Sequence, residues 1–375
     1  MKDPFPAKAA RKLLAAYDEF FLGLTRKDRV AVMHDKDPDG ICAGVILAKQ
    51  VQRMRGRKID LRVNVPGSAY LPTPAIAKRL KRRRINKVII TDISADNEPG
   101  FVRKVARFAQ VIIIDHHKIY SKFKEKNVIL VKPQLLQKKV LPSAYCSSKF
   151  AYDLGNRLVN LTDMDWLAAT GSIADIAAAP WMRWLSSVHK RHKVAMRKDL
   201  FTTRIGQTAT VINSALVYDL RNVPFAFKTV FNAKKPAEVL KSPLRRYHEE
   251  VQGELDKWVR LLDRKAEHHP EHEMIVYYIE PKLHIKSTLS TVLSLKYKHT
   301  TLILLSPVGN MITVSARRHD QKVAMNTLLE CSCKGLKGSS AGGHIPAAGG
   351  RFKRSDLLRF RSQLLDCIAR ARKSS

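Results

Sequence analysis

Ile112-Ile113-Ile114-Asp115-His116-His117 is the stretch of sequence that decides the fold. Its isoleucines, together with the preceding valine, predict a short strand buried on both faces of a sheet. An acid and two imidazoles follow directly where that strand ends. Acidic residues close three other apolar runs in the same way, within segments 34–40, 91–92 and 171–175. We expect these side chains to converge in one pocket, as a bound pair of metal ions requires.

Strands and helices alternate around this stretch. The apolar runs predict strands at 29–33, 59–65, 88–91 and 111–114 and helices at 40–54, 74–83 and 100–108. This alternation predicts an α/β domain with a parallel sheet. Further along the chain, strands at 274–279, 302–306 and 311–315, a glycine-rich stretch and flanking helices predict a second, smaller α/β unit.

The length of the chain also predicts more than one domain. At 375 residues it exceeds the size at which a single hydrophobic core stops growing. We divide it into a leading helix at 1–25, an N-terminal parallel-sheet domain at 26–181, a charged helical connector at 182–270 and a C-terminal α/β domain at 271–375.

The charge of the chain predicts a polyanionic partner. Lys and Arg number 68 against 33 Asp and Glu, a net charge of +35. The basic residues cluster at 78–84, 190–193, 351–354 and 370–373. Such a balance attracts nucleic acid through counterion release. The sequence has no run of about 18 apolar residues and no signal-peptide pattern, so we expect a cytoplasmic protein without a membrane partner.

The five cysteines are expected to be reduced. They form no CxxC pair, which argues against both a zinc site and a disulfide framework. Cys331 and Cys333 are the only close pair, and we interpret them as structural thiols.

The acidic sites all fall at the carboxyl ends of predicted strands, where parallel sheets bind ligands. Asp92 and Asp115 are one strand-helix-strand repeat apart, so adjacent strands would bring their ends together. Asp175 would reach the same crevice from a helix or loop. The residues that we expect there are His34, Asp35, Asp37, Asp39, Asp92, Asp115, His116, His117 and Asp175.

Crowded carboxylates repel each other unless cations balance them. A mixture of carboxylates and imidazoles suits two divalent ions, with manganese preferred and magnesium as the alternative. Taken singly, the Asp-Pro-Asp-Gly segment at 37–40 is also typical of calcium loops and turns. Asp92 alone also fits the N-cap of a helix. The set as a whole favours the metal site.

Four blocks of sequence resemble the motifs of the DHH phosphoesterase superfamily. They are HDKDPDG (34–40), TDIS (91–94), DHH (115–117) and GSIAD (171–175). The later SAR (315–317) and GGHIPAAG (342–349) resemble the DHH-associated substrate-binding domain. Members of this superfamily hydrolyse phosphodiesters or phosphoanhydrides with two manganese or magnesium ions in the first domain, while the second domain holds the substrate.

The resemblance implies a role for each metal-site residue. Asp37 would bind one metal and Asp39 the other, with Asp92 bridging them. His116 and Asp175 would complete the second site. Asp115 would orient an imidazole, and His117 would lie near the scissile phosphate. The remaining ligand is either His34 or Asp35.

The C-terminal motifs predict a phosphate grip. Arg317 can bind a phosphate bidentately with Ser315 as an additional donor. Gly342 and Gly343 free backbone N–H groups to face an anion, and His344 adds a further donor.

Charge separates the branches of the superfamily. A dinucleotide needs few cations, whereas many basic clusters suit a polymer. We therefore expect an exonuclease of the archaeal RecJ-like kind, which hydrolyses single-stranded DNA or RNA from an end with a metal-activated water. Its expected partners are the single strand and proteins of replication or DNA repair. The alternatives are an oligoribonuclease or adenosine-bisphosphate phosphatase of the same superfamily, and a non-catalytic nucleic-acid-binding scaffold.

Overall fold

The computed structural model describes residues 5, 10–65, 71–320 and 322–373, with side chains through residue 371. Residues 1–4 and 6–9 of the predicted leading helix and the side chains of 372–373 in the last basic cluster lie outside this description. The chain forms two compact units, Met1–His248 and Glu249–Ser375. The segment 182–270 is distributed over both units, and the division of the chain into four parts stays a prediction.

A five-stranded sheet with only parallel pairings forms the centre of the first unit. The strand order is β2-β1-β3-β4-β5. The strands are β1 (Val30–His34), β2 (Leu61–Asn64), β3 (Lys87–Thr91), β4 (Gln110–Ile114) and β5 (Val128–Val131). The predicted α/β fold is therefore confirmed, and β5 is a strand that the sequence analysis missed.

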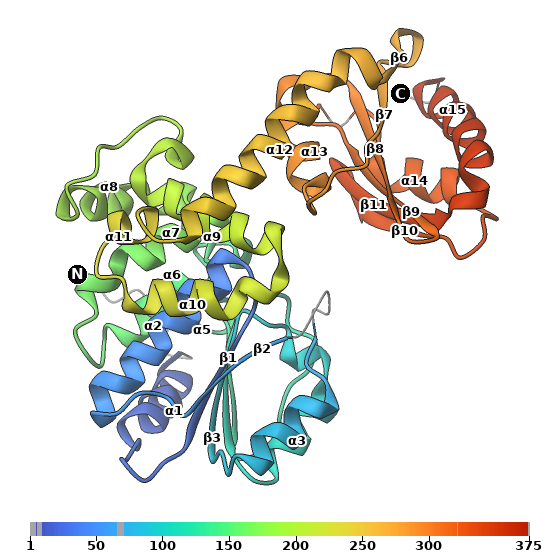
Figure 1. Ribbon diagram of the computed structural model, residues 1–375. Coiled ribbons are helices and arrows are strands. Elements are labelled where there is room, and N and C mark those ends of the chain that lie inside the picture. Colours follow the sequence, from blue (N-terminus) through green and yellow to red (C-terminus); the bar gives the residue numbers. More distant parts are fainter. Residues whose placement is uncertain (1–4, 6–9, 66–70, 321, 374–375) are drawn as a thin grey trace. The chain divides into compact units, whose positions relative to one another are not determined.

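Helices cover both faces of this sheet because its strands are apolar on both sides. Ala31, Met33, Ile90 and Ile113 point into one core, while the alternate residues of the same strands point into the other. Figure 1 shows α3 (Pro74–Arg82) on one face and α1 (Ala10–Leu22) with α2 (Pro38–Arg55) on the other. The helix between β3 and β4 is α4 (Pro99–Ala106).

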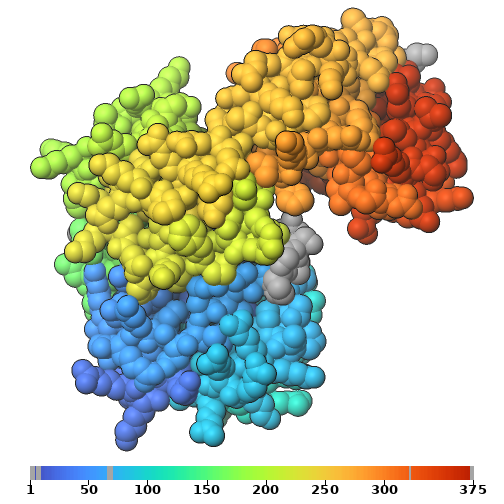
Figure 2. Space-filling view, in the orientation of Figure 1, coloured from blue at the N-terminus to red at the C-terminus, as the bar shows by residue number. Residues whose placement is uncertain are grey.

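The rest of the first unit is helical. Its helices are α5 (Pro133–Leu136), α6 (Ser147–Gly155), α7 (Asp165–Ala174), α8 (Met182–Arg191), α9 (Arg204–Tyr218), α10 (Val223–Asn232), α11 (Pro236–Leu240) and the start of α12 (Leu244–Lys265). α6, α7 and α10 pack on α2, and α9 packs on α7. The yellow-green surface of α10 covers part of the blue surface in Figure 2. These helices therefore enclose α2, whose first turn carries Asp39.

Short 3₁₀ turns connect many of these elements. They are η1 (Ala95–Asn97), η2 (Pro142–Ala144), η3 (Thr162–Met164), η4 (Ala179–Trp181), η5 (Leu200–Thr202), η6 (Leu220–Asn222), η7 (Pro270–His272) and η8 (Arg354–Asp356).

The second unit is a mixed six-stranded sheet with the order β10-β11-β9-β8-β7-β6. Its strands are β6 (Glu267–His269), β7 (Met274–Tyr278), β8 (Thr301–Val308), β9 (Met311–Arg317), β10 (Ser340–His344) and β11 (Ala347–Lys353). Only β7 and β8 pair in parallel. The glycine-rich stretch, to which the sequence analysis assigned no helix or strand, forms strands β10 and β11.

The helices of the second unit also lie on both sides of its sheet. α13 (Lys286–Lys296) contacts β8 and β9, while α14 (Met325–Cys333) packs with α15 (Leu357–Lys373) and against β10 and β11. Ile303, Ile312, Val314 and Ala316 face the core that includes Phe360 of α15.

The expectation that all cysteines are reduced is wrong. Cys331 in α14 and Cys367 in α15 form a disulfide, while Cys333 is a buried free thiol. The packing of α14 on α15 brings Cys367 to Cys331 from 36 positions away, which local spacing in the sequence does not reveal.

Among the described helices, none is long and apolar enough to cross a membrane.

Candidate metal centre

Asp92 and Asp115 follow adjacent strands whose last residues are paired. Thr91 of β3 is in register with Ile114 of β4, so the next residue of each strand lies at the same edge of the sheet. Asp92 has a left-handed backbone with φ of 58°. That conformation is costly for a non-glycine residue and is concentrated at functional sites.

The first turn of α2 supplies two carboxylates. Asp37 caps the helix by accepting a hydrogen bond from the Gly40 amide at 2.8 Å. Asp39 accepts bonds from the backbone amides of Ser147 at 2.7 Å and Ser148 at 3.1 Å. These amides belong to the first turn of α6, where unpaired N–H groups favour an anion. The N-terminus of α6 therefore fixes the carboxylate of Asp39.

Ser147 and Gly171 complete this packing. The Ser147 hydroxyl donates to Oδ1 of Asp92 at 2.8 Å, which links the α6 terminus to the end of β3. A Cβ atom at Gly171 would lie 2.0 Å from Oγ of Ser148 and 2.3 Å from Oδ1 of Asp39. Only glycine lets α7 approach α6 and Asp39 this closely.

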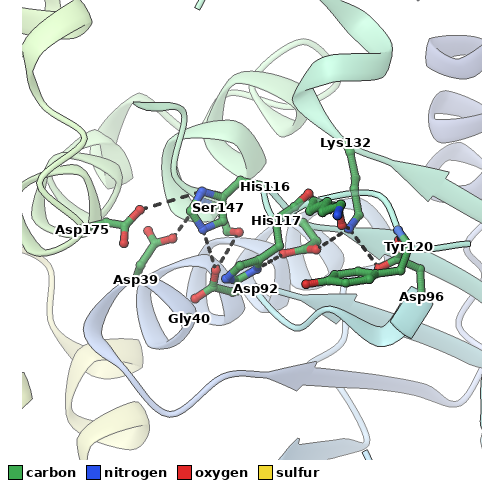
Figure 3. Close-up of polar contacts among 12 residues, drawn as sticks. Asp39, Gly40, Asp92, Asp96, His116, His117, Tyr120, Lys132, Ser147 and Asp175 are labelled. Atoms are coloured by element: carbon green, nitrogen blue, oxygen red, sulfur yellow. Dashed lines mark hydrogen bonds and ion pairs between the residues drawn. The ribbon is translucent and has the colours of Figure 1, made fainter. Parts of the chain in front are cut away.

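His116 lies between two carboxylates (Figure 3). Its Nε2 is 3.5 Å from Oδ1 of Asp92, and its Nδ1 is 3.8 Å from Oδ2 of Asp175, the residue that ends α7. Nδ1 is buried and has no hydrogen-bond partner among the described residues. A buried nitrogen without a partner is costly unless a ligand satisfies it.

Three overlapping groups of side chains have ligand atoms within 4.8 Å of one another. They are Asp35, Asp37 and Asp92; Asp92, His116 and His117; and Asp39, His116 and Asp175. Because Asp92 and His116 each belong to two groups, the three form one continuous centre.

Three buried carboxylates of this centre, those of Asp37, Asp92 and Asp175, resist ionisation. Burial, with repulsion from Asp35 and Asp39, raises the pKa of Asp37 to about 7. Burial, with repulsion from Asp39 and Asp37, raises the pKa of Asp175 to about 8, and the pKa of Asp92 is also well above its usual range. Divalent cations would offset this repulsion. Together with the unsatisfied nitrogen of His116, the donor set fits manganese or magnesium.

His34 and Asp35 point to different surroundings. The imidazole of His34 is fully buried, with Nδ1 2.5 Å from the carbonyl oxygen of Asp35 and Nε2 3.1 Å from Nη1 of Arg62. It also stacks on Phe227. Burial and the charge of Arg62 lower the pKa of His34 to about 3. Only Asp35 of the two belongs to a group that could hold a metal, so the geometry favours Asp35 as a ligand.

A buried lysine lies behind the two histidines. Nζ of Lys132, the residue after β5, is 2.8 Å from Oδ2 of Asp115 and 2.9 Å from Oδ1 of Asp96. The other oxygen of Asp115 is 2.6 Å from Nδ1 of His117. Burial opposes ionisation of Asp115, but the bond from His117 and the charge of Lys132 outweigh it and lower its pKa to about 2. The bond to Asp115 raises the pKa of His117.

The predicted phosphate-binding residues of the second unit, except Gly343, share one face of its sheet. Arg317 of β9 is in register with Ala347 of β11, which is paired with His344 of β10. Neighbouring strands lie about 4.8 Å apart, so Arg317 and His344 are separated by roughly 10 Å. Nε of Arg317 and the hydroxyl of Ser315 both donate to Oγ of Ser290 in α13, at 3.1 and 2.9 Å.

The two glycines of this motif differ. Gly342 shares the row of Ser315 through Gly349, whereas Gly343 is in the alternate row with Ala348 and Ala316. Strand alternation therefore places Gly342 on the face of Arg317 and Gly343 on the opposite face.

Residues 29–179 match the DHH family, N-terminal domain. The segment 29–179 is therefore similar to the N-terminal domain of the DHH family. A search of curated proteins found no match.

Solved structures share the fold of this chain. RecJ from Thermus thermophilus in complex with Mn²⁺ has a TM-score of 0.67 at 19% identity, over 98% of this chain and 56% of that one. An exonuclease RecJ bound to manganese has a TM-score of 0.67 at 19% identity, over 97% and 95%. The DHH domain of a member of a ribosomal-protein family has a TM-score of 0.69 at 15% identity, over 98% and 92%. This chain thus spans about half the length of the Thermus RecJ.

The sequence motifs of the DHH domain meet at one site, with one exception. Asp35, Asp37, Asp39, Asp92, His116, His117 and Asp175 belong to the three groups, and Asp115 holds His117 from behind. His34 lies outside these groups. Sequence reasoning missed Lys132, Asp96 and Ser147. A lysine directly after the apolar run 128–131 was the available signal for a buried cation at the end of a further strand.

Proposed function

We propose that this protein is a metal-dependent phosphodiesterase that removes nucleotides from an end of single-stranded DNA or RNA, as a RecJ-like exonuclease. The observation that carries the proposal is that two ligand groups, Asp35–Asp37–Asp92 and Asp39–His116–Asp175, are joined into one continuous centre by the third group, Asp92–His116–His117. Asp92 belongs to one group and is 3.5 Å from His116 of the other. A carboxylate that bridges two ions must lie close to the ligands of both, and Asp92 meets this requirement.

Each ligand residue has a task in this proposal. Asp35 and Asp37 would hold one ion, Asp39, His116 and Asp175 would hold the other, and Asp92 would be available to both. Bound manganese or magnesium ions would activate a water and offset the charge that develops on the phosphoryl group.

His117 would contact the substrate. Its imidazole is 46% exposed, and Nδ1 is held by Asp115. With its raised pKa, the ring can carry a proton on Nε2 and donate it in a hydrogen bond to a phosphate oxygen. Lys132 and Asp115 fix the orientation of this ring.

The charge of the chain supports a polymeric substrate. A net charge of +35 exceeds what a dinucleotide requires and suits a strand with many phosphates. Arg317 and His344 would hold one phosphate of that strand on the sheet face of the second unit. The manganese-bound exonuclease RecJ with which the chain shares its fold gives further support.

The test is manganese-dependent release of nucleotides from end-labelled single strands. Asp92→Asn should abolish release while binding of the strand persists, because the carboxylate is lost without a change in side-chain size. Asp18→Asn, which changes an acid paired with Arg157, should keep the wild-type rate. An undiminished rate in Asp92→Asn would overturn the proposal.

The same assay separates the competing functions. Faster turnover of dinucleotides or of adenosine bisphosphate than of long strands would identify an oligoribonuclease or bisphosphate phosphatase. If the protein binds strands but hydrolyses none of the substrates with any of the metals, it is a scaffold.

A further inference from the structure

A basic pocket lies at the junction of α8 and α9 in the first unit, outside the metal centre. The cavity has a volume of about 330 Å³, and Lys193, Arg197 and Arg204 contribute to its lining. Thr203 and Gln207 supply neutral polar groups to the same wall. The cavity is therefore lined by cations and by groups that donate hydrogen bonds.

The three cations of this pocket have no acidic partners. All three are exposed, and within the described part of the chain neither a salt bridge nor a side-chain hydrogen bond engages them. Segment 182–204 contains seven Lys and Arg residues and one acid, Asp199. Oδ1 of Asp199 accepts the amide of Phe201 at 2.9 Å at the start of η5. The segment therefore supplies one negative charge against seven positive ones, and Asp199 makes no ion pair with the three pocket cations among the described residues.

The walls of the pocket are held in place. His189 of α8 is fully buried, with Nδ1 2.8 Å from the carbonyl oxygen of Leu185 and Nε2 3.3 Å from the hydroxyl of Thr203. A Cβ atom at Gly206 would lie 2.1 Å from the carbonyl oxygen of Leu200. Such close packing fixes the segment that carries the cations, so a ligand would meet a preorganised site.

Two exposed apolar side chains lie on the same segment. Phe201 is 42% exposed and Met196 is 37% exposed. Proteins bind single strands with two kinds of side chain. Basic side chains contact the phosphate backbone, and an aromatic ring provides a surface on which a base can stack. A site for free phosphate alone would need the cations but not the aromatic ring.

We propose that this pocket binds a phosphodiester of single-stranded nucleic acid, as a second grip on the strand apart from the metal centre. The inference rests on the proposed function because it takes the single strand to be the substrate. Inorganic phosphate shares the recognised chemistry, and it is the alternative source that the experiment must separate.

The test measures binding of a single strand of about 20 nucleotides, longer than the site of one binding module, in EDTA so that hydrolysis plays no part. The variant is Lys193→Gln, Arg197→Gln and Arg204→Gln together. The control is Lys78→Gln, Lys81→Gln and Arg82→Gln on the exposed face of α3, which removes the same charge. Thermal melting of both variants checks that they fold.

Loss of the pocket cations should weaken binding at least tenfold and lower the slope of log affinity against log salt by about 2, since each single-strand phosphate contact contributes about 0.7. The α3 control should lose less than a third of that effect. Manganese-dependent turnover of a dinucleotide should stay at the wild-type value, because a dinucleotide does not need the second grip.

Unchanged affinity in the pocket variant, or an equal loss in the α3 control, would overturn the proposal. Inorganic phosphate could bind the wild-type protein, but not the variant, and leave the affinity for the strand unchanged. That result would identify a site for free anions and would overturn the proposal as well. Because binding is measured without metal, its outcome does not depend on whether the protein hydrolyses nucleic acid. Failure of the proposed function would appear only in the nucleotide-release assay.

Discussion

Nζ of Lys132 lies 2.8 Å from Oδ2 of Asp115, and neither side chain is exposed to solvent. Lys132 also pairs with Asp96, so one buried cation serves two buried acids. Through Asp115 it reaches His117, whose Nδ1 is 2.6 Å from the other carboxylate oxygen. Lys132 is therefore a positioning residue for the imidazole that faces solvent.

Lys132→Met should destabilise the protein by about 3–5 kcal/mol, because it leaves two buried carboxylates without their cation. Below its melting temperature the variant should also lose nucleotide release, because Lys132 no longer fixes Asp115 behind the imidazole of His117. The pKa of His117 should rise further, since the charge of Lys132 lowers it. Urea unfolding and a pH profile of activity measure these effects.

The matched control for Lys132 is Arg55→Met. Arg55 is another buried cation, paired with Asp60, and it lies in the last turn of α2, at the end opposite the acids of the first turn. It should cost comparable stability but keep activity below its melting temperature. Equal loss of activity in both variants would show that Lys132 contributes to stability alone and does not position His117.

Asp35→Asn should lower the affinity for Mn²⁺ by more than about tenfold, because loss of a ligand costs at least as much as loss of an outer partner, typically about 10–100-fold. His34→Gln should destabilise the fold but keep the metal affinity, since both ring nitrogens of His34 already contact protein atoms. Calorimetric titration of Mn²⁺ distinguishes the two. Loss of affinity in His34→Gln alone would show that the ligand is the histidine.

Gly171→Ala should displace the carboxylate of Asp39, because the new methyl group would lie 2.3 Å from Oδ1 of Asp39. Overpacking of this kind typically costs about 1–3 kcal/mol. We expect a larger effect on Mn²⁺ affinity than on stability. Gly253→Ala in α12 meets nothing within 4 Å, so it should leave the Mn²⁺ affinity unchanged and raise stability by up to about 1 kcal/mol, as alanine does inside a helix. Retained metal affinity in Gly171→Ala would contradict the role of the α6–α7 approach.

The sequence predicted the parts of the fold that local patterns encode. Strands β1, β3 and β4 are continuous apolar runs, and their parallel order places Asp92 beside Asp115 as expected. β5 follows a long segment without a helix, so the βαβ pattern did not predict it. β10 and β11 contain glycines that disfavour strands, and their pairing depends on β9.

For the site, too, the sequence predicted only what local patterns encode. The DHH motif and the acids that accompany it could be predicted because they directly follow apolar runs that form strands. His34 and Asp35 are neighbours in sequence, and only Arg62 and Phe227 reveal which side chain turns away. Lys132 acquires its role from partners 17 and 36 positions away, Asp115 and Asp96, which no local spacing indicates.

The disulfide between Cys331 and Cys367 should stabilise the second unit. It closes a segment with a sequence separation of 36, for which the chain-entropy estimate is about 4 kcal/mol. Cys331→Ser with Cys367→Ser should lower the melting temperature of this unit, whereas Cys333→Ala should keep the bond. Thiol titration of the unreduced, denatured chain should find the three free thiols Cys42, Cys146 and Cys333. Five reactive thiols would contradict the bond.

Removal of metal should make the stability of the first unit fall as pH rises. The pKa values of Asp37 and Asp175 are raised to about 7 and about 8, and that of Asp92 is also raised, so the folded state binds more protons than the unfolded state. Stability from these groups is therefore present below the unfolded pKa of about 3.9 and is lost progressively up to the folded values. His34 acts in the opposite direction, but only below its unfolded pKa of about 6.5.

The clean window for this test is from about pH 6.5 to about pH 8 in EDTA. There, Asp175→Asn should gain stability over the wild type by about 1 kcal/mol per pH unit, because the amide does not ionise. Saturating Mn²⁺ should make the wild type more stable than Asp175→Asn, since the ion binds the carboxylate and stabilises only the wild type fully. Melting temperatures of both proteins across the window measure the effect. A gap between wild type and Asp175→Asn that stays constant with pH would show that Asp175 ionises normally in the metal-free centre, and that its neighbours do not repel it.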